Sequence, residues 1–230
     1  MAYSRKYLED FPDFKSIYFV NDDMWWSEED SRGYGDQFES NKDPIGPVLP
    51  LLKGNSVAVQ AGANCGWVTR EVAKHFSDVY TFEPDALSFL CVCMNLPQDN
   101  VHKFQACLGS THETVKINTD CRSDWGSGAD HVEPNPQGEV GSVPTILIDD
   151  LNLKACDFIQ LDLEGYEYFA LEGAKNTITK FKPVLQIEVA HHARYGVSLE
   201  QIKDFMKQYG YENFRPIGVG GVGGNDWIAY

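Results

Sequence analysis

The feature that most constrains the fold is a regular alternation of short apolar runs with segments of helical pattern, which begins at Val48 and continues to the end of the chain. Strands that alternate with helices in this way are typical of a parallel sheet covered by helices on both faces. The sequence therefore predicts an α/β fold. We see no internal repeat and no low-complexity tail.

The expected elements are bounded by Gly, Pro and Asn residues that stop strands or helices. Strands are predicted at 57–60, 79–82, 101–108, 115–117, 158–161, 184–189, 211–214 and 227–230. Helices are predicted at 67–76, 85–96, 168–180 and 199–209. The segment 119–141 is rich in Gly, Pro, Asp, Asn and Ser and is predicted to be a loop. The glycine-rich run 218–224 is interpreted as a hairpin turn, because phosphate-binding loops lead into a helix N-terminus instead.

Composition excludes several classes of protein. Hydrophobic residues make up 43% of the chain, enough for a core, so wholesale disorder is excluded. No apolar run reaches the roughly 18–20 residues that a membrane helix needs, and the polar segment Met1–Asp10 lacks a signal-peptide core. We therefore expect a cytoplasmic protein. Six cysteines without a Cys-x-x-Cys pair are expected to be free thiols.

The chain is acidic, with 19 Lys and Arg against 34 Asp and Glu. Binding to a polyanion depends on clustered basic residues, so we expect neither nucleic acid nor membrane as a partner. The charge is concentrated in residues 1–46 and 112–150, each with a net charge of −6. We predict an acidic N-terminal cap at 1–46 and a second domain at 47–230, in which loop 119–141 lies on the substrate side. Within this domain the stretches 47–111 and 151–230 are nearly balanced in charge.

The first candidate site is the turn that follows the strand at 57–60 and opens a helix. It comprises Gln60, Gly62, Ala63, Asn64 and Gly66. Glycine allows a tight turn and close approach of a ligand. The dinucleotide fingerprint Gly-x-Gly-x-x-Gly is absent, so the spacing suits a ligand without a pyrophosphate. A plain strand-to-helix turn is the alternative.

The second candidate, Glu83, ends the next strand and stands before Pro84, 21 residues after Gly62. An acid at about this distance binds ribose hydroxyls in doubly wound folds, because a carboxylate accepts two hydrogen bonds from a diol. The alternative is a surface Glu favoured by the following helix dipole. Adenosine without a pyrophosphate indicates S-adenosylmethionine rather than NAD.

Acids also follow two later strands. Asp162 and Glu164 come after the strand at 158–161 and would face the same side, and Glu188 ends the strand at 184–189. His191 or His192 could act as a base near neutral pH. The alternatives are helix capping for the acids and packing under the loop for a histidine. A divalent metal is possible but not favoured, and we assign no metal ligand.

Taken in order, these segments resemble the FkbM-type class I methyltransferases from about Pro44 to Tyr230. The stretches that carry the resemblance are Ala61–Gly66, Tyr80–Pro84 with Asn95, Ile148–Leu151, Leu161–Glu167 and Leu171–Ala174. The resemblance implies a Rossmann-like, doubly wound, seven-stranded, mostly parallel sheet with a C-terminal antiparallel hairpin.

The resemblance also implies roles for single residues. The 61–66 segment would wrap the methionine end of S-adenosylmethionine, and Glu83 would bind the ribose. Cys107 and Leu108 would border the adenine, and Asp162 with the segment after it would border the methyl group and the acceptor. Gln60 stands where the family usually has an acid, so we expect cofactor binding to survive but to be weaker.

The function that these observations imply is S-adenosylmethionine-dependent methylation, with O-methylation of a hydroxyl on a small molecule, sugar or glycan favoured. The candidate bases are Glu188, His191 and Glu164. The acidic regions argue for a neutral or cationic acceptor. Gln160, where a Lys is usual, motivates with Gln60 one alternative, a non-catalytic cofactor-binding module. A protein methyltransferase is the other alternative.

Overall fold

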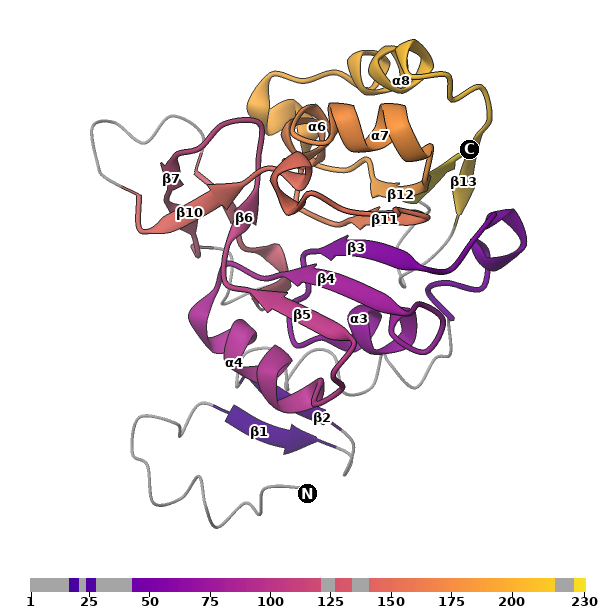
Figure 1. Ribbon diagram of the computed structural model, residues 1–230. Helices are drawn as coiled ribbons and strands as arrows, with labels where there is room; N and C mark the ends of the chain where they lie inside the picture. Colours follow the sequence, from indigo (N-terminus) through magenta and orange to yellow (C-terminus); the bar gives the residue numbers. More distant parts are fainter. Residues whose placement is uncertain (1–16, 21–23, 28–42, 121–126, 134–140, 218–225) are drawn as a thin grey trace.

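A seven-stranded sheet forms the centre of the computed structural model, which describes residues 17–20, 24–27, 43–120, 127–133, 141–217 and 226–230 (Figure 1). In spatial order its strands are β13 (Phe214–Ile217), β14 (Asp226–Ala229), β12 (Val184–Glu188), β11 (Phe158–Leu161), β3 (Val57–Ala61), β4 (Asp78–Phe82) and β5 (Val101–Phe104). The five strands from β12 to β5 are parallel, and β14 is antiparallel to both of its neighbours. The predicted doubly wound sheet with a C-terminal antiparallel hairpin is confirmed.

The central strands are buried over their whole length or nearly so. Every residue of β3 and β11 is buried, and in β12 only Glu188 keeps partial exposure. Each of the three strands is apolar apart from one buried glutamine and the terminal Glu188. Such nearly continuous apolar runs are typical of parallel strands that are covered on both faces. This burial explains why these strands were predicted from sequence with nearly correct bounds.

Helices cover both faces of the sheet. The α-helices are α3 (Trp67–Val72), α4 (Ala86–Asn95), α6 (Glu167–Glu172), α7 (Lys175–Phe181) and α8 (Leu199–Gln208). The 3-10 helices are η3 (Leu49–Leu51), η4 (Ser127–Ala129), η5 (Ile148–Leu151) and η6 (His192–Tyr195). One core cluster joins the sheet to α6, α7 and α8, and a second joins it to α3 and η3. Figure 1 shows α6, α7 and α8 over the β11–β12 half of the sheet.

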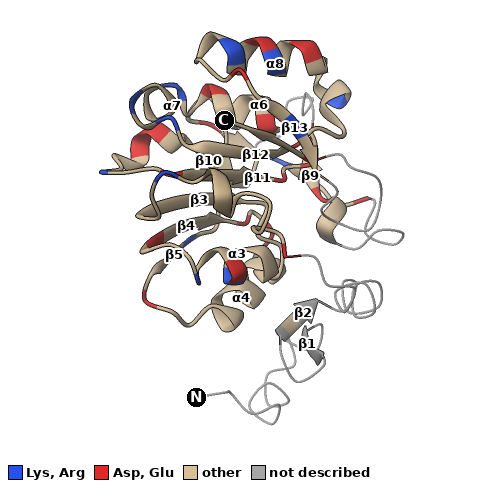
Figure 2. Cartoon of the chain, turned by 90° about the vertical axis from the view of Figure 1, so that its right-hand side faces the viewer, with Lys and Arg blue, Asp and Glu red and all other residues tan. Residues whose placement is uncertain are grey.

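Local signals in the sequence begin two of these helices. The Asp85 side chain caps α4 by accepting hydrogen bonds from the backbone N–H groups of Leu87 and Ser88. Ser198 and Gln201 form a reciprocal capping box at the start of α8. Acidic and basic residues are interspersed along α8, as the colours of Figure 2 show.

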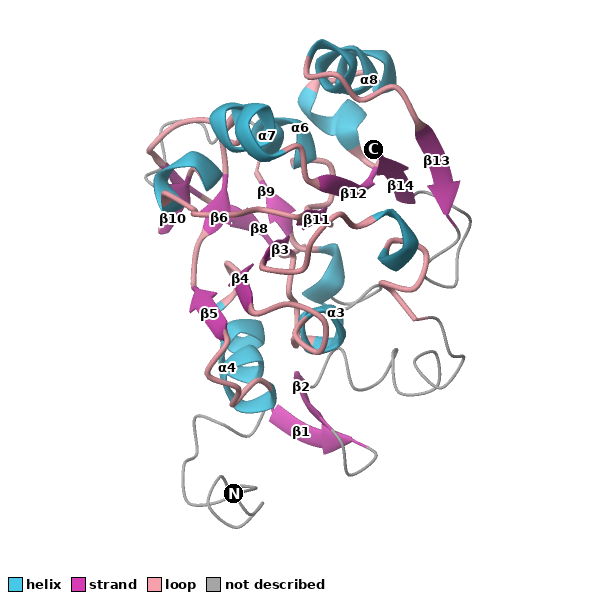
Figure 3. Ribbon diagram, turned by 45° about the vertical axis from the view of Figure 1, so that its right-hand side comes forward, coloured by secondary structure: helices cyan, strands magenta, loops and turns pink. Residues whose placement is uncertain are grey.

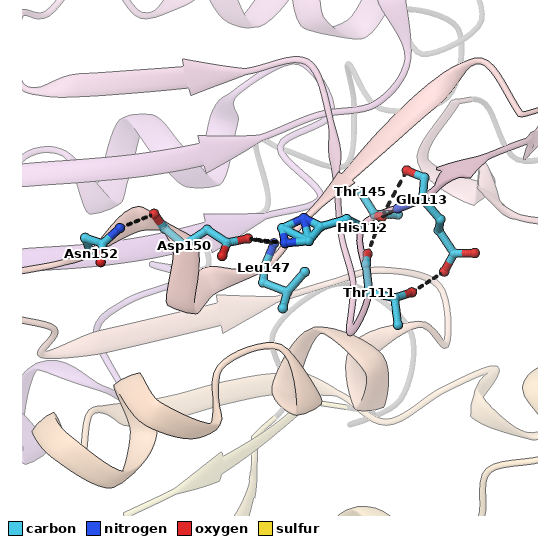
Figure 4. Close-up of polar contacts among 7 residues, drawn as sticks. All are labelled: Thr111, His112, Glu113, Thr145, Leu147, Asp150 and Asn152. Atoms are coloured by element: carbon cyan, nitrogen blue, oxygen red, sulfur yellow. Dashed lines mark hydrogen bonds and ion pairs between the residues drawn. The ribbon is translucent and has the colours of Figure 1, made fainter.

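Short strands extend the fold beyond the carboxyl ends of the main sheet. The β6 (Cys107–Leu108), β10 (Val143–Ile146) and β7 (Thr114–Val115) strands form a three-stranded sheet, and β8 (Ile117–Asn118) pairs with β9 (His131–Val132) (Figure 3). The β6–β7 connection is fastened to β10, because the Thr145 hydroxyl accepts a hydrogen bond from the Glu113 N–H and donates one to the Thr111 carbonyl (Figure 4). His112 also lies 3.3 Å from the Asp150 carboxylate in η5.

The structure corrects several predicted bounds. The strand expected at 101–108 is two strands, because the chain leaves the main sheet after Phe104 and β6 pairs with the unpredicted β10. The helix expected at 168–180 is α6 and α7, since the Asp149 carboxylate accepts hydrogen bonds from the N–H groups of Asn176 and Thr177 and starts a new helix there. The strand expected at 211–214 begins at Phe214, because Tyr211 is buried with its hydroxyl on the Pro183 carbonyl.

The N-terminal region is described only in part. The β1 (Ile17–Val20) and β2 (Met24–Ser27) strands form a hairpin beside α4, visible at the lower edge of Figure 1. Ile45 and Val48, on either side of the predicted domain boundary, are buried in the same cluster against the main sheet. The rest of the predicted cap, most of loop 119–141 and the glycine run 218–224 lie outside the described residues.

Two further expectations concern composition. Within the described ranges, no helix is long and apolar enough to cross a bilayer. The five cysteines in those ranges are all free thiols, and Cys121 lies outside them.

Candidate functional site

The candidate residues gather at the carboxyl edge of the main sheet, where the strand order reverses. From β3 the chain proceeds to β4 and β5 on one side, and from β11 it proceeds to β12 on the other. Open α/β sheets bind ligands outside the carboxyl ends of their strands at such a point. The segments that leave β3, β4, β11 and β12 all end there.

The turn after β3 depends on glycine. Gly62 has a φ of +78°, and its N–H and that of Ala63 both donate to the carbonyl at the end of β4, at 3.1 Å. A Cβ atom on Gly62 would lie 1.8 Å from the Asp162 carbonyl oxygen, so only glycine lets this turn pass the exit of β11. Asn64 and Gly66 also have positive φ, at 49° and 91°. Three residues with positive φ in five therefore make this connection a tight loop.

Gln60 lies beneath this turn and is fully buried. Its Oε1 accepts hydrogen bonds from the Thr69 hydroxyl at 2.7 Å and the Thr81 hydroxyl at 2.6 Å, and its Nε2 donates to the Gly62 carbonyl at 3.2 Å. The amide thus ties β3 to α3, β4 and the turn. A contact between Gln60 and the cofactor's ammonium stays a prediction, but protein groups already engage both ends of the amide.

Glu83 is buried at the end of β4 and is held by backbone N–H groups. Its Oε2 accepts a hydrogen bond from Asn64 at 2.7 Å and its Oε1 accepts one from Asp85 at 2.8 Å, across Pro84. Burial raises the pKa of Glu83 to about 8, against the opposing effect of those two N–H groups. The carboxyl group therefore links the turn after β3 to the start of α4.

Cys107 lies close enough to this carboxyl group to be affected by its charge, and Leu108 follows it in β6. Both are buried in β6, and burial, assisted by the negative charge of Glu83, raises the pKa of the Cys107 thiol to about 12. Asp130, next to η4 in loop 119–141, raises the pKa of both Glu83 and Glu164 by like-charge repulsion. The described part of this loop therefore lies beside both parts of the site.

Three predicted acids come together at the ends of β11 and β12. One carboxylate oxygen from each of Asp162, Glu164 and Glu188 lies within 4.8 Å of the others. Asp162 is the exposed member of the three, but burial of its carboxyl group raises its pKa to about 6. Burial raises the pKa of Glu164 to about 7 and that of Glu188 to about 10. Repulsion among the acids adds to the shifts of Glu164 and Glu188, and Glu188 donates a hydrogen bond to Asp162.

Asp226 is a further acid of this group that sequence reasoning missed. It pairs with Glu188 across β12 and β14, and it accepts a hydrogen bond from the Gln186 side chain. Burial and the charge of Asp162 raise the pKa of Asp226 to about 7. The feature that could have identified Asp226 is its pairing with Glu188 in the strand register, and this pairing can be derived only once the bounds of β14 are known.

Glu167 has a structural role in the same loop. It is fully buried, and its Oε1 accepts hydrogen bonds from the N–H groups of Leu163 at 2.7 Å and Gly165 at 3.2 Å. Burial raises the pKa of Glu167 to about 8. These bonds hold Glu164 at a φ of +53° and so fix the backbone from which it reaches the other acids.

The structure distinguishes the two histidines. His191 Nε2 lies 3.5 Å from Glu164 Oε2, and burial together with the positive charge of Arg194 lowers the pKa of His191. His192 turns back on its own segment, with Nδ1 2.7 Å from the Val189 carbonyl oxygen. Only His191 is therefore placed beside the acids.

Comparison with known proteins agrees with this geometry. The family model for the methyltransferase FkbM domain matches residues 60–212, about two thirds of the chain. None of the curated proteins compared with the chain matches it.

One of the solved structures that resemble the chain supports the same fold. Methyltransferase FkbM from Methylobacillus flagellatus KT is similar with a TM-score of 0.55 and 20% identity, over 79% of this chain and 45% of that one. This chain thus spans less than half of that relative. A precorrin-6y C5,15-methyltransferase from Geobacter metallireducens GS-15 is similar with a TM-score of 0.46 and 15% identity, over 79% and 84% of the two chains.

The family match covers the turn after β3, Glu83 and all three clustered acids, and the sheet order is that of the class I methyltransferase fold. The chain therefore belongs to the FkbM methyltransferase family.

Proposed function

We propose that this protein is an S-adenosylmethionine-dependent methyltransferase that methylates a hydroxyl group on a small molecule, sugar or glycan. The observation that carries the proposal is the convergence of Glu83 and the acids Asp162, Glu164 and Glu188 on one edge of the sheet. Family membership supports the cofactor, and the acids beside a histidine support the transfer to a hydroxyl.

The residues at the turn fit the cofactor. Glu83 offers carboxylate oxygens for a ribose diol, and the glycine turn leaves room for a ligand beside the backbone. Cys107 and Leu108 would border the adenine, and Asp162 would lie on the methionine side. Bound in this place, S-adenosylmethionine supplies a methyl group activated by its sulfonium sulfur.

The acceptor hydroxyl must lose its proton as its oxygen forms the new bond to the methyl carbon. His191 is best placed to take that proton at Nδ1, because its Nε2 lies 3.5 Å from the Glu164 carboxylate, which stabilises the imidazolium that forms. Glu164 and Glu188 are the other candidates. Glu188 donates a hydrogen bond to Asp162 and would have to release its own proton first.

The acidity of the site supports a neutral or cationic acceptor. A phosphorylated or carboxylated molecule would meet Asp130 as well as the three clustered acids. The same argument makes nucleic acid and membrane surfaces poor partners. Protein methylation and cofactor binding without turnover stay as alternatives, and turnover on small hydroxylated acceptors separates them from the proposal.

The cofactor is tested by calorimetric titration of the wild type and a Glu83→Ala variant with S-adenosylmethionine and S-adenosylhomocysteine. We expect Glu83→Ala to weaken binding by about 1–3 kcal/mol, the cost of losing a buried polar partner. Glu200→Ala, which removes an exposed acid on α8, should bind both ligands like the wild type. Absence of binding by the wild type would contradict the proposed function.

The acceptor class is tested by methyl transfer from labelled cofactor to a panel of neutral, cationic, carboxylated and phosphorylated alcohols and sugars. We expect product only with the first two groups. Turnover confined to anionic acceptors would show that the acidic side chains do not select the substrate.

A further inference from the structure

A row of polar side chains runs under the acid cluster. Gln160 in β11 and Gln186 in β12 are paired in register, and each lies two residues before an acid of the cluster, Asp162 and Glu188. Because side chains in a strand alternate between faces, all four lie on the same face of the sheet. The two glutamines thus form a buried layer directly beneath the two acids.

This layer contains acceptor atoms that the protein leaves unsatisfied. Gln160 and Gln186 are only 4% and 2% exposed, and the Oε1 atom of each has no hydrogen-bond partner among the described residues. The Gln186 amide is directed to the cluster, since it donates a hydrogen bond to Asp226. Glu188 Oε2 is likewise buried without a partner. A buried acceptor without a donor costs about 1–3 kcal/mol, so three of them in one place point to a ligand that supplies donors or charge.

The charges around the cluster are predominantly negative. Glu188 is surrounded by Asp162, Glu164, Glu167 and Asp226. The cation that acts on the group, Arg194, lies at Glu164 and donates to its backbone carbonyl, whereas the lowered pKa of His191 disfavours the charged imidazolium. The charged groups that act most strongly on Glu188 are all acidic.

We propose that Asp162, Glu164 and Glu188 bind one hard divalent cation, and that water on this ion donates hydrogen bonds to the buried oxygens beneath. Carboxylate oxygens are the ligands that Mg²⁺, Mn²⁺ and Ca²⁺ prefer. Oxygens on opposite sides of Ca²⁺ are about 4.6–5.2 Å apart, and those around Mg²⁺ at most about 4.2 Å. The observed upper limit of 4.8 Å accommodates Ca²⁺ as it stands and the smaller ions after a slight contraction.

Asp226 and Gln186 would not contact the ion but would help to fix the orientation of its carboxylate ligand Glu188. Gln186 holds Asp226, and Asp226 lies across from Glu188 on β14. Outer groups of this kind tune the affinity of a metal site. An ion here could also hold the acceptor oxygen and lower its pKa; that catalytic use rests on the proposed function, whereas binding of the ion does not.

The experiment uses the full chain freed of metal with a chelator. Mn²⁺ is titrated and its free fraction is followed by electron paramagnetic resonance, and Ca²⁺ is added in thermal unfolding, both with and without S-adenosylhomocysteine. We expect one saturable Mn²⁺ site per chain and a rise in the unfolding temperature with Ca²⁺.

Two matched substitutions locate the ion. Glu188→Gln should weaken Mn²⁺ binding at least tenfold and abolish the Ca²⁺ effect, whereas Glu200→Gln on α8 should change neither. Glu188→Gln is also expected to fold, because a neutral amide removes repulsion from the cluster. Asp162→Asn gives the same test if circular dichroism shows that Glu188→Gln is misfolded.

The proposal is overturned if the wild type has no saturable site, or if Glu188→Gln and Asp162→Asn bind Mn²⁺ as tightly as the wild type. A third result also overturns it: Mn²⁺ binds neither to the wild type nor to Glu188→Gln, and S-adenosylhomocysteine binds more weakly to Glu188→Gln than to the wild type. In that case the acid cluster binds the ammonium group of the cofactor instead of a metal ion. That result leaves the proposed function intact. Mn²⁺ binding without any cofactor binding would instead retain the cation site and overturn the proposed function.

Discussion

At the scale of single residues, a comparison of Gly62 with Gly196 distinguishes two ways in which an added side chain can lower stability: a strained backbone angle and a steric clash. Both have positive φ, at +78° and +69°, but a Cβ atom on Gly62 would meet the Asp162 carbonyl, whereas one on Gly196 would meet nothing within 4 Å. We expect Gly196→Ala to lower the free energy of unfolding by about 1–2 kcal/mol, the cost of the left-handed backbone. Gly62→Ala should lower it by more than about 3 kcal/mol, because the exits of β3 and β11 must also separate.

Urea unfolding of the two variants measures this difference, and cofactor titration of the folded fraction shows whether the turn has moved. Equal losses of stability in the two variants would mean that the clash between the new Cβ atom and the Asp162 carbonyl is removed without loss of stability. Gly62 would then be needed only for its positive φ.

Residues at fixed spacings were predictable from the sequence, and residues that meet through strand register were not. Glu83 follows from its distance to Gly62, and Asp162 and Glu188 follow from the strand ends. Asp226 became visible only through its pairing with Glu188. The hydrogen bonds of Gln60 to Thr69 and Thr81 depend on the packing of α3 against β4, which sequence spacing does not give.

At the scale of elements, Asn95 at the end of α4 joins the N-terminal hairpin to the turn after β3. Its Oδ1 accepts a hydrogen bond from the Trp25 N–H at 2.7 Å, and its Nδ2 donates to the Trp25 carbonyl at 2.8 Å and to the Cys65 carbonyl at 2.6 Å. We expect Asn95→Ala to release β2 from α4, because it removes both hydrogen bonds between the Asn95 side chain and the Trp25 backbone. Hydrogen exchange of strand 24–27 and quenching of Trp25 fluorescence should both increase.

Asn95→Asp is the matched control, since it keeps the acceptor for the Trp25 N–H but loses both donated bonds. It should give an intermediate loss of protection in strand 24–27. Unchanged exchange in Asn95→Ala would mean that the hairpin is held by packing alone. A parallel loss of affinity for S-adenosylhomocysteine would show that the hairpin supports the turn through Cys65.

Long buried elements were predictable, and short paired ones were not. The strand at 158–161 has the predicted bounds because it is a fully buried run, apolar except for Gln160, between Asp157 and Asp162. The four-residue strand β10 was missed because Pro144 lacks an N–H and argues against a strand. It exists because its two halves pair with different strands, Thr145 and Ile146 with β6 and the preceding two residues with β7.

At the scale of the whole molecule, the two halves of the sheet each bury a carboxyl group that closes a loop, and this burial makes stability depend on pH. Glu83 and Glu167 are 7% and 0% exposed, and burial raises the pKa of each from 4.5 to about 8. Between these values the folded chain keeps protons that the unfolded chain releases. The free energy of unfolding must therefore fall as the pH rises from about 4.5 to 8. The excess of acidic residues adds repulsion in the same direction.

Urea unfolding at pH 5, 6, 7 and 8, in chelator and without cofactor, measures this slope. His191 opposes it, because its lowered pKa makes the folded chain bind fewer protons below about pH 6.5. It is one group against Glu83, Glu167 and the four acids at the ends of β11, β12 and β14, whose pKa values are raised as well. Glu83→Gln and Glu167→Gln should each flatten the slope, since an amide has no proton to lose over this range. A free energy of unfolding that is constant or rises from pH 5 to 8 in the wild type would show that both carboxyl groups are ionised in the fold, and that their backbone N–H donors outweigh burial.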